Sequence, residues 1–138
     1  MPVGTLIHAI THDGVVRILE LAGYTIGQRQ GQSIVVNSPA GNAMLIALYG
    51  CGQGGCPWLR VRGFLAAESA AAAAALIETY EWQVPIAIVM PADDEQGQIV
   101  AIGRDIYLAS GITPTNLFAN INAVDGLVQN AQAELDGQ

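Results

Sequence analysis

The chain has 138 residues, of which 51% are hydrophobic, and this length and composition predict a single soluble domain spanning residues 1–138. Twelve acidic residues outnumber five basic ones, giving a formal charge of −7, and the basic residues form no long run, which argues against binding to nucleic acid or to an anionic membrane surface. Gly, Pro or charged residues interrupt every apolar stretch and the first residues lack a secretory signal pattern, so we expect no membrane helix and a cytoplasmic location.

The first predicted element is a short amphipathic helix between Thr11 and Gly23. Thr11 is a residue type favoured at the N-cap, and Asp13 suits the positive end of the helix dipole. Apolar residues recur at helical spacing, at Val15, Ile18, Leu19 and Ala22. Because glycine is common just after a helix, Gly23 predicts where this one ends.

From residue 24 to residue 67 the hydrophobic period changes to two, which is typical of β-strands. Turn residues separate strand-like segments at 25–30, 33–37, 42–49 and 58–66. Two or three antiparallel strands joined by hairpins are the simplest interpretation. In the last segment Leu59, Val61 and Leu65 point to one face, and the side chains that point to the other are Trp58, Arg60, Arg62 and Phe64.

An alanine-rich helix is predicted over residues 68–82, and its small side chains suit a surface helix or close packing against the sheet or a second subunit. Residues 86–90 and 98–108 then predict a second hairpin around a polar loop. A long last helix begins after the N-cap Thr113, with Pro114 in its first turn. Its apolar stripe consists of Leu117, Ile121, Val124, Val128, Ala131 and Leu135.

These elements predict an α+β fold with one antiparallel sheet of about five strands. The predicted order is α-β-β-β-α-β-β-α, and the first and last helices should pack on the apolar face of the sheet.

Three segments carry a resemblance to a known family: Gly23-Tyr24, residues 42–51 and residues 108–113. In hydrophobic pattern and turns, over nearly the whole chain, the sequence resembles the YbjN family of bacterial proteins, which are labelled sensory transduction regulators. That resemblance implies a fold like that of the dimeric type III secretion chaperones, and hence a homodimer that binds another protein. The chain departs from the family at Glu78 and Glu81, where members usually carry two Asn residues.

The glycine-rich segment between the strands matches a nucleotide-binding pattern. Gly50, Gly52 and Gly55 satisfy Gly-x-Gly-x-x-Gly, but no helix follows whose N-terminus could bind a phosphate. We therefore interpret the segment as a hairpin connection, and no cofactor is expected.

Cys51 and Cys56 flank these glycines, in a loop flexible enough to bring the two sulfurs within bonding range. A reducing cytoplasm predicts free thiols, and a redox-responsive disulfide is the alternative. A zinc site formed with His8 and His12 is disfavoured, because the standard ligand spacing is missing and the two histidines straddle the predicted helix start. No metal site is expected.

The sequence does not indicate catalysis. The acidic run at residues 93–95 suits a solvated hairpin tip, and no nucleophile motif accompanies the histidines. An enzyme would need a pocket that joins residues such as Arg104 and Asp105, and the sequence does not predict one. We therefore expect no catalytic residues.

The function that these observations favour is protein binding. Trp and Arg are enriched at protein interfaces, so the strand face of Trp58, Arg60, Arg62 and Phe64 is a candidate docking surface. An equally good interpretation is a half-exposed sheet face with Arg stems over aromatic rings. The expected function is a non-enzymatic chaperone-like or regulatory module, and the alternative is a thiol- or ligand-responsive sensor that uses Cys51 and Cys56.

Overall fold

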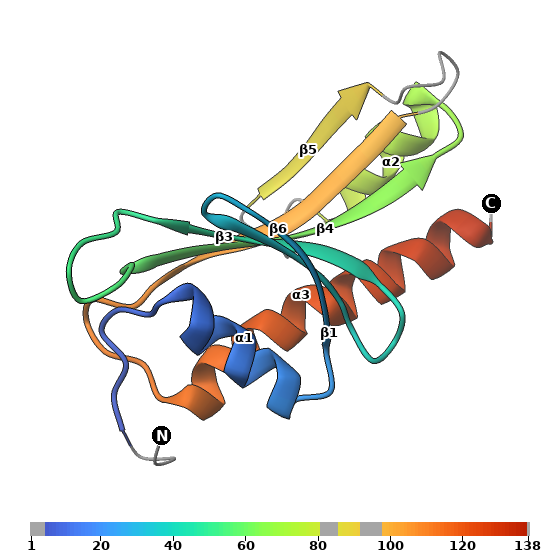
Figure 1. The fold of residues 1–138 in the computed structure, drawn as a ribbon. Helices are drawn as coiled ribbons and strands as arrows, with labels where there is room; N and C mark the ends of the chain where they lie inside the picture. The colour runs from blue at the N-terminus through green and yellow to red at the C-terminus, as the bar shows by residue number, and fades with distance from the viewer. Residues whose placement is uncertain (1–4, 81–85, 92–97, 138) are drawn as a thin grey trace.

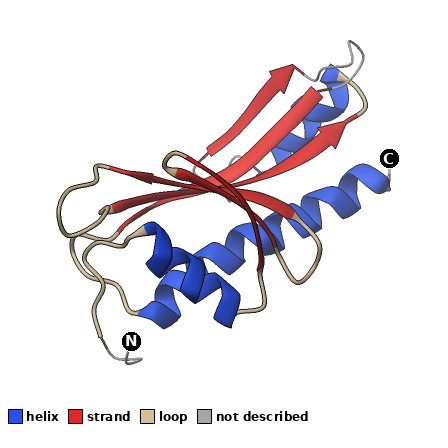
Figure 2. Cartoon of the chain, in the orientation of Figure 1, coloured by secondary structure: helices blue, strands red, loops and turns tan. Residues whose placement is uncertain are grey.

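The computed structural model describes residues 5–80, 86–91 and 98–137 and has an α+β fold (Figures 1 and 2). Its elements in chain order are α1 (His12–Leu21), β1 (Thr25–Gln30), β2 (Ser33–Asn37), β3 (Ala43–Tyr49), β4 (Trp58–Ala67), α2 (Ala70–Tyr80), β5 (Ile86–Pro91), β6 (Gln98–Tyr107) and α3 (Pro114–Asp136). The strands form one antiparallel sheet in the spatial order β1-β2-β3-β4-β6-β5.

The predicted α+β class and antiparallel sheet are confirmed, and the described sheet has six strands where about five were predicted. Four of them, β1 to β4, precede α2. The additional strand arises at Gly31, whose φ of 57° lies in the left-handed region that glycine adopts easily. The chain reverses there, so Gln30 pairs with Ser33 and the two flanking segments become separate strands.

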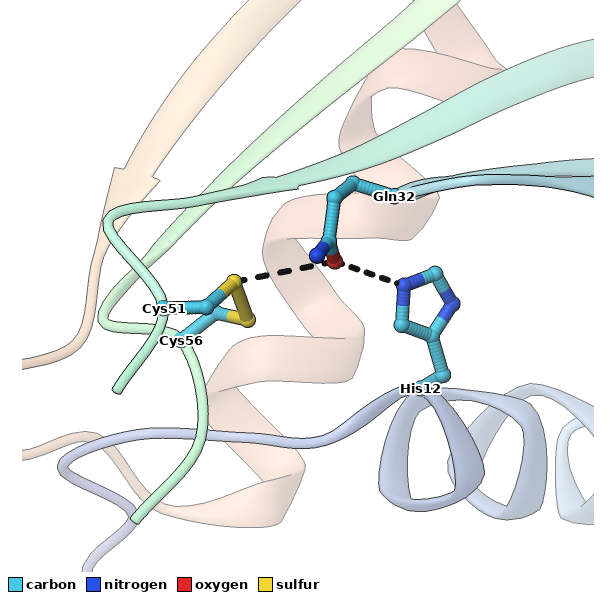
Figure 3. The surroundings of a disulfide bond; sticks show 4 residues. All are labelled: His12, Gln32, Cys51 and Cys56. Atoms are coloured by element: carbon cyan, nitrogen blue, oxygen red, sulfur yellow. Dashed lines mark hydrogen bonds between the residues drawn. A yellow bond between two sulfur atoms is a disulfide. The ribbon is translucent and has the colours of Figure 1, made fainter. Parts of the chain in front are cut away.

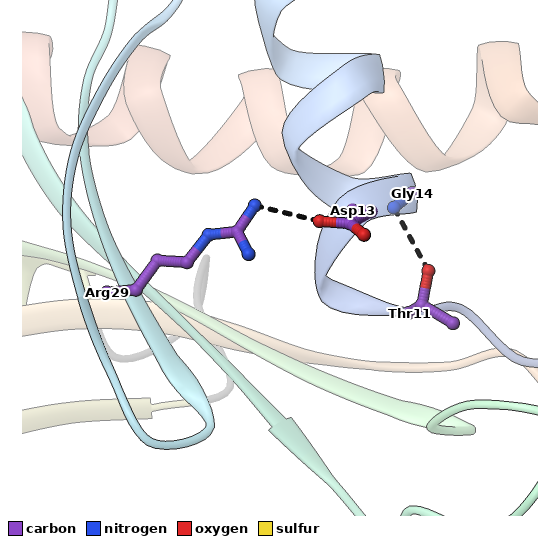
Figure 4. A network of polar contacts seen from close by, with 4 residues as sticks. All are labelled: Thr11, Asp13, Gly14 and Arg29. Atoms are coloured by element: carbon purple, nitrogen blue, oxygen red, sulfur yellow. Dashed lines mark hydrogen bonds and ion pairs between the residues drawn. The ribbon is translucent and has the colours of Figure 1, made fainter.

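Threonine caps begin α1 and α3, as predicted. Thr11 Oγ1 accepts a hydrogen bond of 3.1 Å from the backbone N–H of Gly14, as Figure 4 shows, and Thr113 caps α3 in the same way. Asp13 in the first turn of α1 pairs with Arg29 of β1 at 3.0 Å. Because both side chains are exposed, this ion pair contributes little to stability.

The core lies between the helices and one face of the sheet. In Figure 1, α1 and α3 lie together on one side of the sheet, and their buried apolar residues belong to the same core cluster as those of α2. The apolar stripe predicted for the last helix faces this core, and its six residues are buried or half-buried. The prediction that the first and last helices cover the apolar face is confirmed.

The alanine-rich helix begins at Ala70, two residues later than predicted, and forms part of the same core. It contacts β4, β5, β6 and α3 and buries Ala73 and Leu76. Glu81 and the acidic run at residues 93–95 lie outside the described residues. Within the described ranges, no helix has the length and apolar character needed to cross a membrane.

Candidate functional site

The face of the sheet that points away from the helices carries the predicted docking residues. Leu59 and Val61 are fully buried towards the helices, so Trp58, Arg60, Arg62 and Phe64 project from the opposite face by strand alternation. We call this opposite face the open face, because none of the described helices packs on it. Its centre is formed by three neighbouring strands, β3, β4 and β6.

Three large aromatic residues are exposed at one end of the open face. Tyr49 of β3 pairs with Trp58 of β4, and Trp58 in turn pairs with Tyr107 of β6. Their exposed fractions are 46%, 41% and 49% respectively. The Trp58 and Tyr107 rings lie 4.5 Å apart between centroids, so the three residues form a continuous aromatic patch.

An ion pair lies beside this aromatic patch. Arg60 donates to both carboxylate oxygens of Asp105, from Nε at 2.8 Å and from Nη2 at 3.2 Å, and its guanidinium lies 5.0 Å from the centroid of the Tyr49 ring. The hydrogen bond to Asp105 holds the pKa of Arg60 above its ordinary value. A shallow hollow of about 290 Å³ is lined by Tyr49, Trp58, Leu59, Arg60 and Asp105.

The other two predicted residues lie farther along β4. Arg62 pairs across the sheet with Gly103, and its stem covers that glycine so closely that a Cβ there would approach Arg62 Cγ to 2.7 Å. Arg62 Nε is buried and has no hydrogen-bond partner among the described residues. Phe64 is half-buried and pairs with Ala101. The candidate site therefore centres on Trp58 and Arg60.

Three members of this surface were not predicted from the sequence: Tyr49, Tyr107 and Asp105. A signal for Tyr49 existed, because Tyr49 and Trp58 stand at the two ends of the same glycine-rich connection and a hairpin pairs such residues. The other two come from β6, which is far away in sequence, and only the register of β4 with β6 brings them to the patch.

Arg104 and Asp105, the pair named from the sequence as an example for an enzymatic pocket, do not lie on the same face of the sheet. They are consecutive residues of β6 and therefore point to opposite faces. Arg104 Nη1 donates to Asn120 Oδ1 of α3 at 2.9 Å, whereas Asp105 binds Arg60 on the open face.

The glycine motif connects β3 to β4, as predicted, and the two cysteines within it are joined. Cys51 and Cys56 form a disulfide, with their Cα atoms 3.9 Å apart (Figure 3). The prediction of free thiols was therefore wrong for this state of the chain. The glycine-rich turn between the cysteines brings them together, since Gly52 and Gly55 exchange two backbone hydrogen bonds.

The two histidines do not share a site, because each forms a hydrogen bond with a different partner. His8 precedes α1, and its Nδ1 lies 3.0 Å from the carbonyl oxygen of Ala109. His12 is the first residue of α1, and its Nε2 lies 2.9 Å from Gln32 Oε1. Among the described residues, no group of three or more His, Cys, Asp or Glu side chains could hold a metal ion.

No known family model matches this sequence, and no curated protein matches it. The structure is similar to the crystal structure of YbjN from E. coli, a protein described as a candidate transcription regulator. The TM-score is 0.70 at 13% sequence identity, and the similarity covers 95% of each chain. At that identity the likeness shows a shared fold, so the resemblance to YbjN proteins noted in the sequence is confirmed for the fold alone.

Proposed function

We propose that this chain is a non-enzymatic protein-binding module, chaperone-like or regulatory in role, that docks its partner on the open face. The observation that carries the proposal is the aromatic patch of Tyr49, Trp58 and Tyr107 beside the Arg60–Asp105 pair. Tyr, Trp and Arg are the residue types that dominate the binding energy of protein interfaces, because they combine a large contact area with directed hydrogen bonds.

The charges on this face suggest the chemistry of the partner. The chain as a whole is acidic, yet the open face presents two arginines, Arg60 and Arg62, against one described carboxylate, Asp105. A partner segment with apolar or aromatic side chains flanked by acidic ones would complement it. The shallow hollow beside Trp58 suits one inserted side chain.

The fold similarity to YbjN supports a wider proposal. We propose that the chain belongs with the YbjN proteins, shares the type III secretion chaperone-like architecture, and acts as a cytoplasmic homodimer. Light scattering of the purified chain tests the dimer, because a monomer has a mass of 14.4 kDa and a dimer twice that value. A single species at the monomer mass across the concentration range would contradict it.

The docking proposal is tested by crosslinking. A photoreactive phenylalanine analogue at position 107 should capture a partner from the native host lysate in stoichiometric amount. The same analogue at Leu21, which is 81% exposed on α1, is the matched control. Capture only from position 107 supports docking on the open face, whereas equal capture from both positions contradicts it.

A second experiment measures how much the aromatic patch contributes to affinity for the captured partner. Trp58→Ala combined with Tyr107→Ala should weaken binding by about 2 kcal/mol or more, as expected for truncated aromatic hot spots. Leu21→Ala should leave the affinity unchanged, since it removes an exposed apolar side chain from another surface. Retained affinity in a folded double variant would exclude the patch as the docking site.

A further inference from the structure

Cys51 and Cys56 have different surroundings, although one disulfide joins them. Cys51 is exposed in the connection that follows β3, whereas Cys56 is only 4% exposed. The backbone of Cys56 is also fixed, because its N–H donates to the carbonyl oxygen of Ile10 at 2.8 Å and its carbonyl oxygen accepts from the Ile10 N–H at 2.9 Å. An external reagent can therefore reach Cys51 more easily than Cys56.

The backbone between the cysteines supports their proximity independently of the disulfide. Gly52 and Gly55 exchange backbone hydrogen bonds of 3.0 and 3.2 Å, which close a tight turn. Gly55 has a φ of 109°, and a Cβ there would lie 2.9 Å from the backbone of Ile10. Because this turn and the Ile10 bridge require no sulfur–sulfur bond, they would keep two free thiols close enough to rejoin.

A hydrogen-bond acceptor, Gln32 Oε1, lies near the sulfur of Cys51. Gln32 Oε1, at the tip of the β1–β2 hairpin, lies 3.7 Å from Cys51 Sγ and 2.9 Å from His12 Nε2 (Figure 3). A disulfide sulfur carries no hydrogen, so the sulfur–oxygen approach is only a contact in this structure. A thiol at the same place has a hydrogen to donate to Gln32 Oε1, so reduction would convert that contact into a hydrogen bond.

We propose that Cys51 and Cys56 form a reversible thiol–disulfide exchange site whose substrate is an external thiol. The thiolate of the first external thiol attacks Cys51 Sγ, the Cys51–Cys56 bond breaks, and Cys56 leaves as a thiolate that takes a proton from solvent. A second external thiolate attacks the outer sulfur of the mixed disulfide and releases the Cys51 thiolate, which also takes a proton. Two electrons pass to the cysteine pair, and the two external thiols become one disulfide. This activity does not depend on docking at the open face.

The first test places the folded wild-type chain in mixtures of reduced and oxidised glutathione, with free thiols trapped by alkylation and counted by mass spectrometry. We expect the two thiols to appear together, and the same disulfide fraction to be reached from oxidised and from reduced protein. A disulfide that resists excess reduced glutathione in the folded chain, as stable structural disulfides do, would overturn the proposal. Two thiols that oxidised glutathione cannot rejoin would also overturn it.

The second test identifies the sulfur that is attacked. With oxidised glutathione, Cys56→Ala should form a mixed disulfide at Cys51 faster than Cys51→Ala does at Cys56, by a factor on the order of ten or more, because only Cys51 is exposed. Wild-type protein quenched early in reduction gives the same information without a variant that could misfold. Its glutathione should be attached to Cys51, and attachment to Cys56 would overturn the proposed direction of attack.

A third test concerns Gln32 as a positioning residue. Gln32→Leu removes the acceptor of the hydrogen bond from the Cys51 thiol, so the redox equilibrium should shift towards the disulfide by roughly twofold to threefold, the effect of one weak S–H···O hydrogen bond. Gln30→Leu is the matched control, because Gln30 is an exposed glutamine of the same hairpin. Equal equilibria in the two variants would exclude Gln32 from the site.

Discussion

Tyr24 lies between α1 and β1, and its side chain is buried against α3. Its ring meets Phe118 edge-on with centroids 6.4 Å apart, and its hydroxyl lies 3.5 Å from Asn122 Oδ1, which is long for a hydrogen bond. Burial, with a smaller contribution from the negative charge of Asp125, raises the pKa of Tyr24 from 10.0 to about 12. The folded chain therefore favours the neutral phenol.

This shift predicts a loss of stability at alkaline pH. The unfolded chain releases the Tyr24 proton near pH 10.0 and the folded chain keeps it to about 12, so the contribution of Tyr24 to folding is complete below pH 10 and disappears as the pH rises through 12. Tyr24→Phe has no proton to lose and should lie within about 1 kcal/mol of wild type at neutral pH. Urea unfolding below and above pH 10 measures the free energy of unfolding of the wild type and of the variant. An equal alkaline decline in the variant would contradict the assignment to Tyr24.

Residues whose role is local were predictable from the sequence, and residues whose role depends on distant neighbours were not. Thr11, Thr113 and Gly23 occupy their predicted cap positions because a cap is decided within one helical turn. The disulfide between Cys51 and Cys56 was only the alternative to the predicted free thiols. It accompanies a turn that is held against Ile10, and the sequence gives no sign of that contact.

At the scale of elements, α3 approaches β4 unusually closely at one point. Gly63 of β4 faces Val128 of α3, and a Cβ at Gly63 would overlap the Val128 side chain. Because both residues are buried, neither the helix nor the strand can move away without disturbing the core. The absence of a side chain at residue 63 therefore sets the distance between this helix and the sheet.

The contact between Gly63 and Val128 predicts non-additive effects on stability, which a double-mutant cycle can measure. Gly63→Ala should destabilise the chain by about 1–3 kcal/mol through overpacking, and Val128→Ala by on the order of 2 kcal/mol through a cavity. The double variant should cost less than the two single changes together, because the new methyl group occupies the space that Val128 leaves. Chemical denaturation gives the change in the free energy of unfolding for each single variant and for the double variant. Strict additivity would show that the two side chains do not compete for space.

The number of elements was less predictable than their type. Helical and strand-like periods were identified correctly, and Gly31 was seen to separate two strand-like segments. Only two or three strands were nevertheless predicted before the alanine-rich helix, because the period of two within a segment does not show whether that segment pairs as a strand of its own. The open face was predicted from one strand only. Its full composition requires the register of β3, β4 and β6, which hydrophobic alternation within β4 does not contain.

At the scale of the whole molecule, the three helices share one core with the sheet, and this continuity predicts cooperative unfolding. Buried residues of α1, α2 and α3 belong to a single cluster with the inner face of the sheet, so no part of the described chain has a separate core. Thermal unfolding should show one transition, with coincident circular dichroism and fluorescence and equal calorimetric and van't Hoff enthalpies. Two separated transitions would contradict the single domain that the sequence predicts.

The disulfide should stabilise this cooperative unit without being required for folding. It closes a ring of only a few residues, 51–56, so its effect on the entropy of the unfolded chain is modest, about 2 kcal/mol. Full reduction should then lower the melting temperature by about 5–10 °C and leave the transition cooperative. The double variant Cys51→Ser with Cys56→Ala is the control, because its melting temperature should not respond to reductant. Unfolding of the whole chain on reduction would mean that the disulfide is structural, and an unchanged melting temperature would mean that the ring contributes nothing to stability.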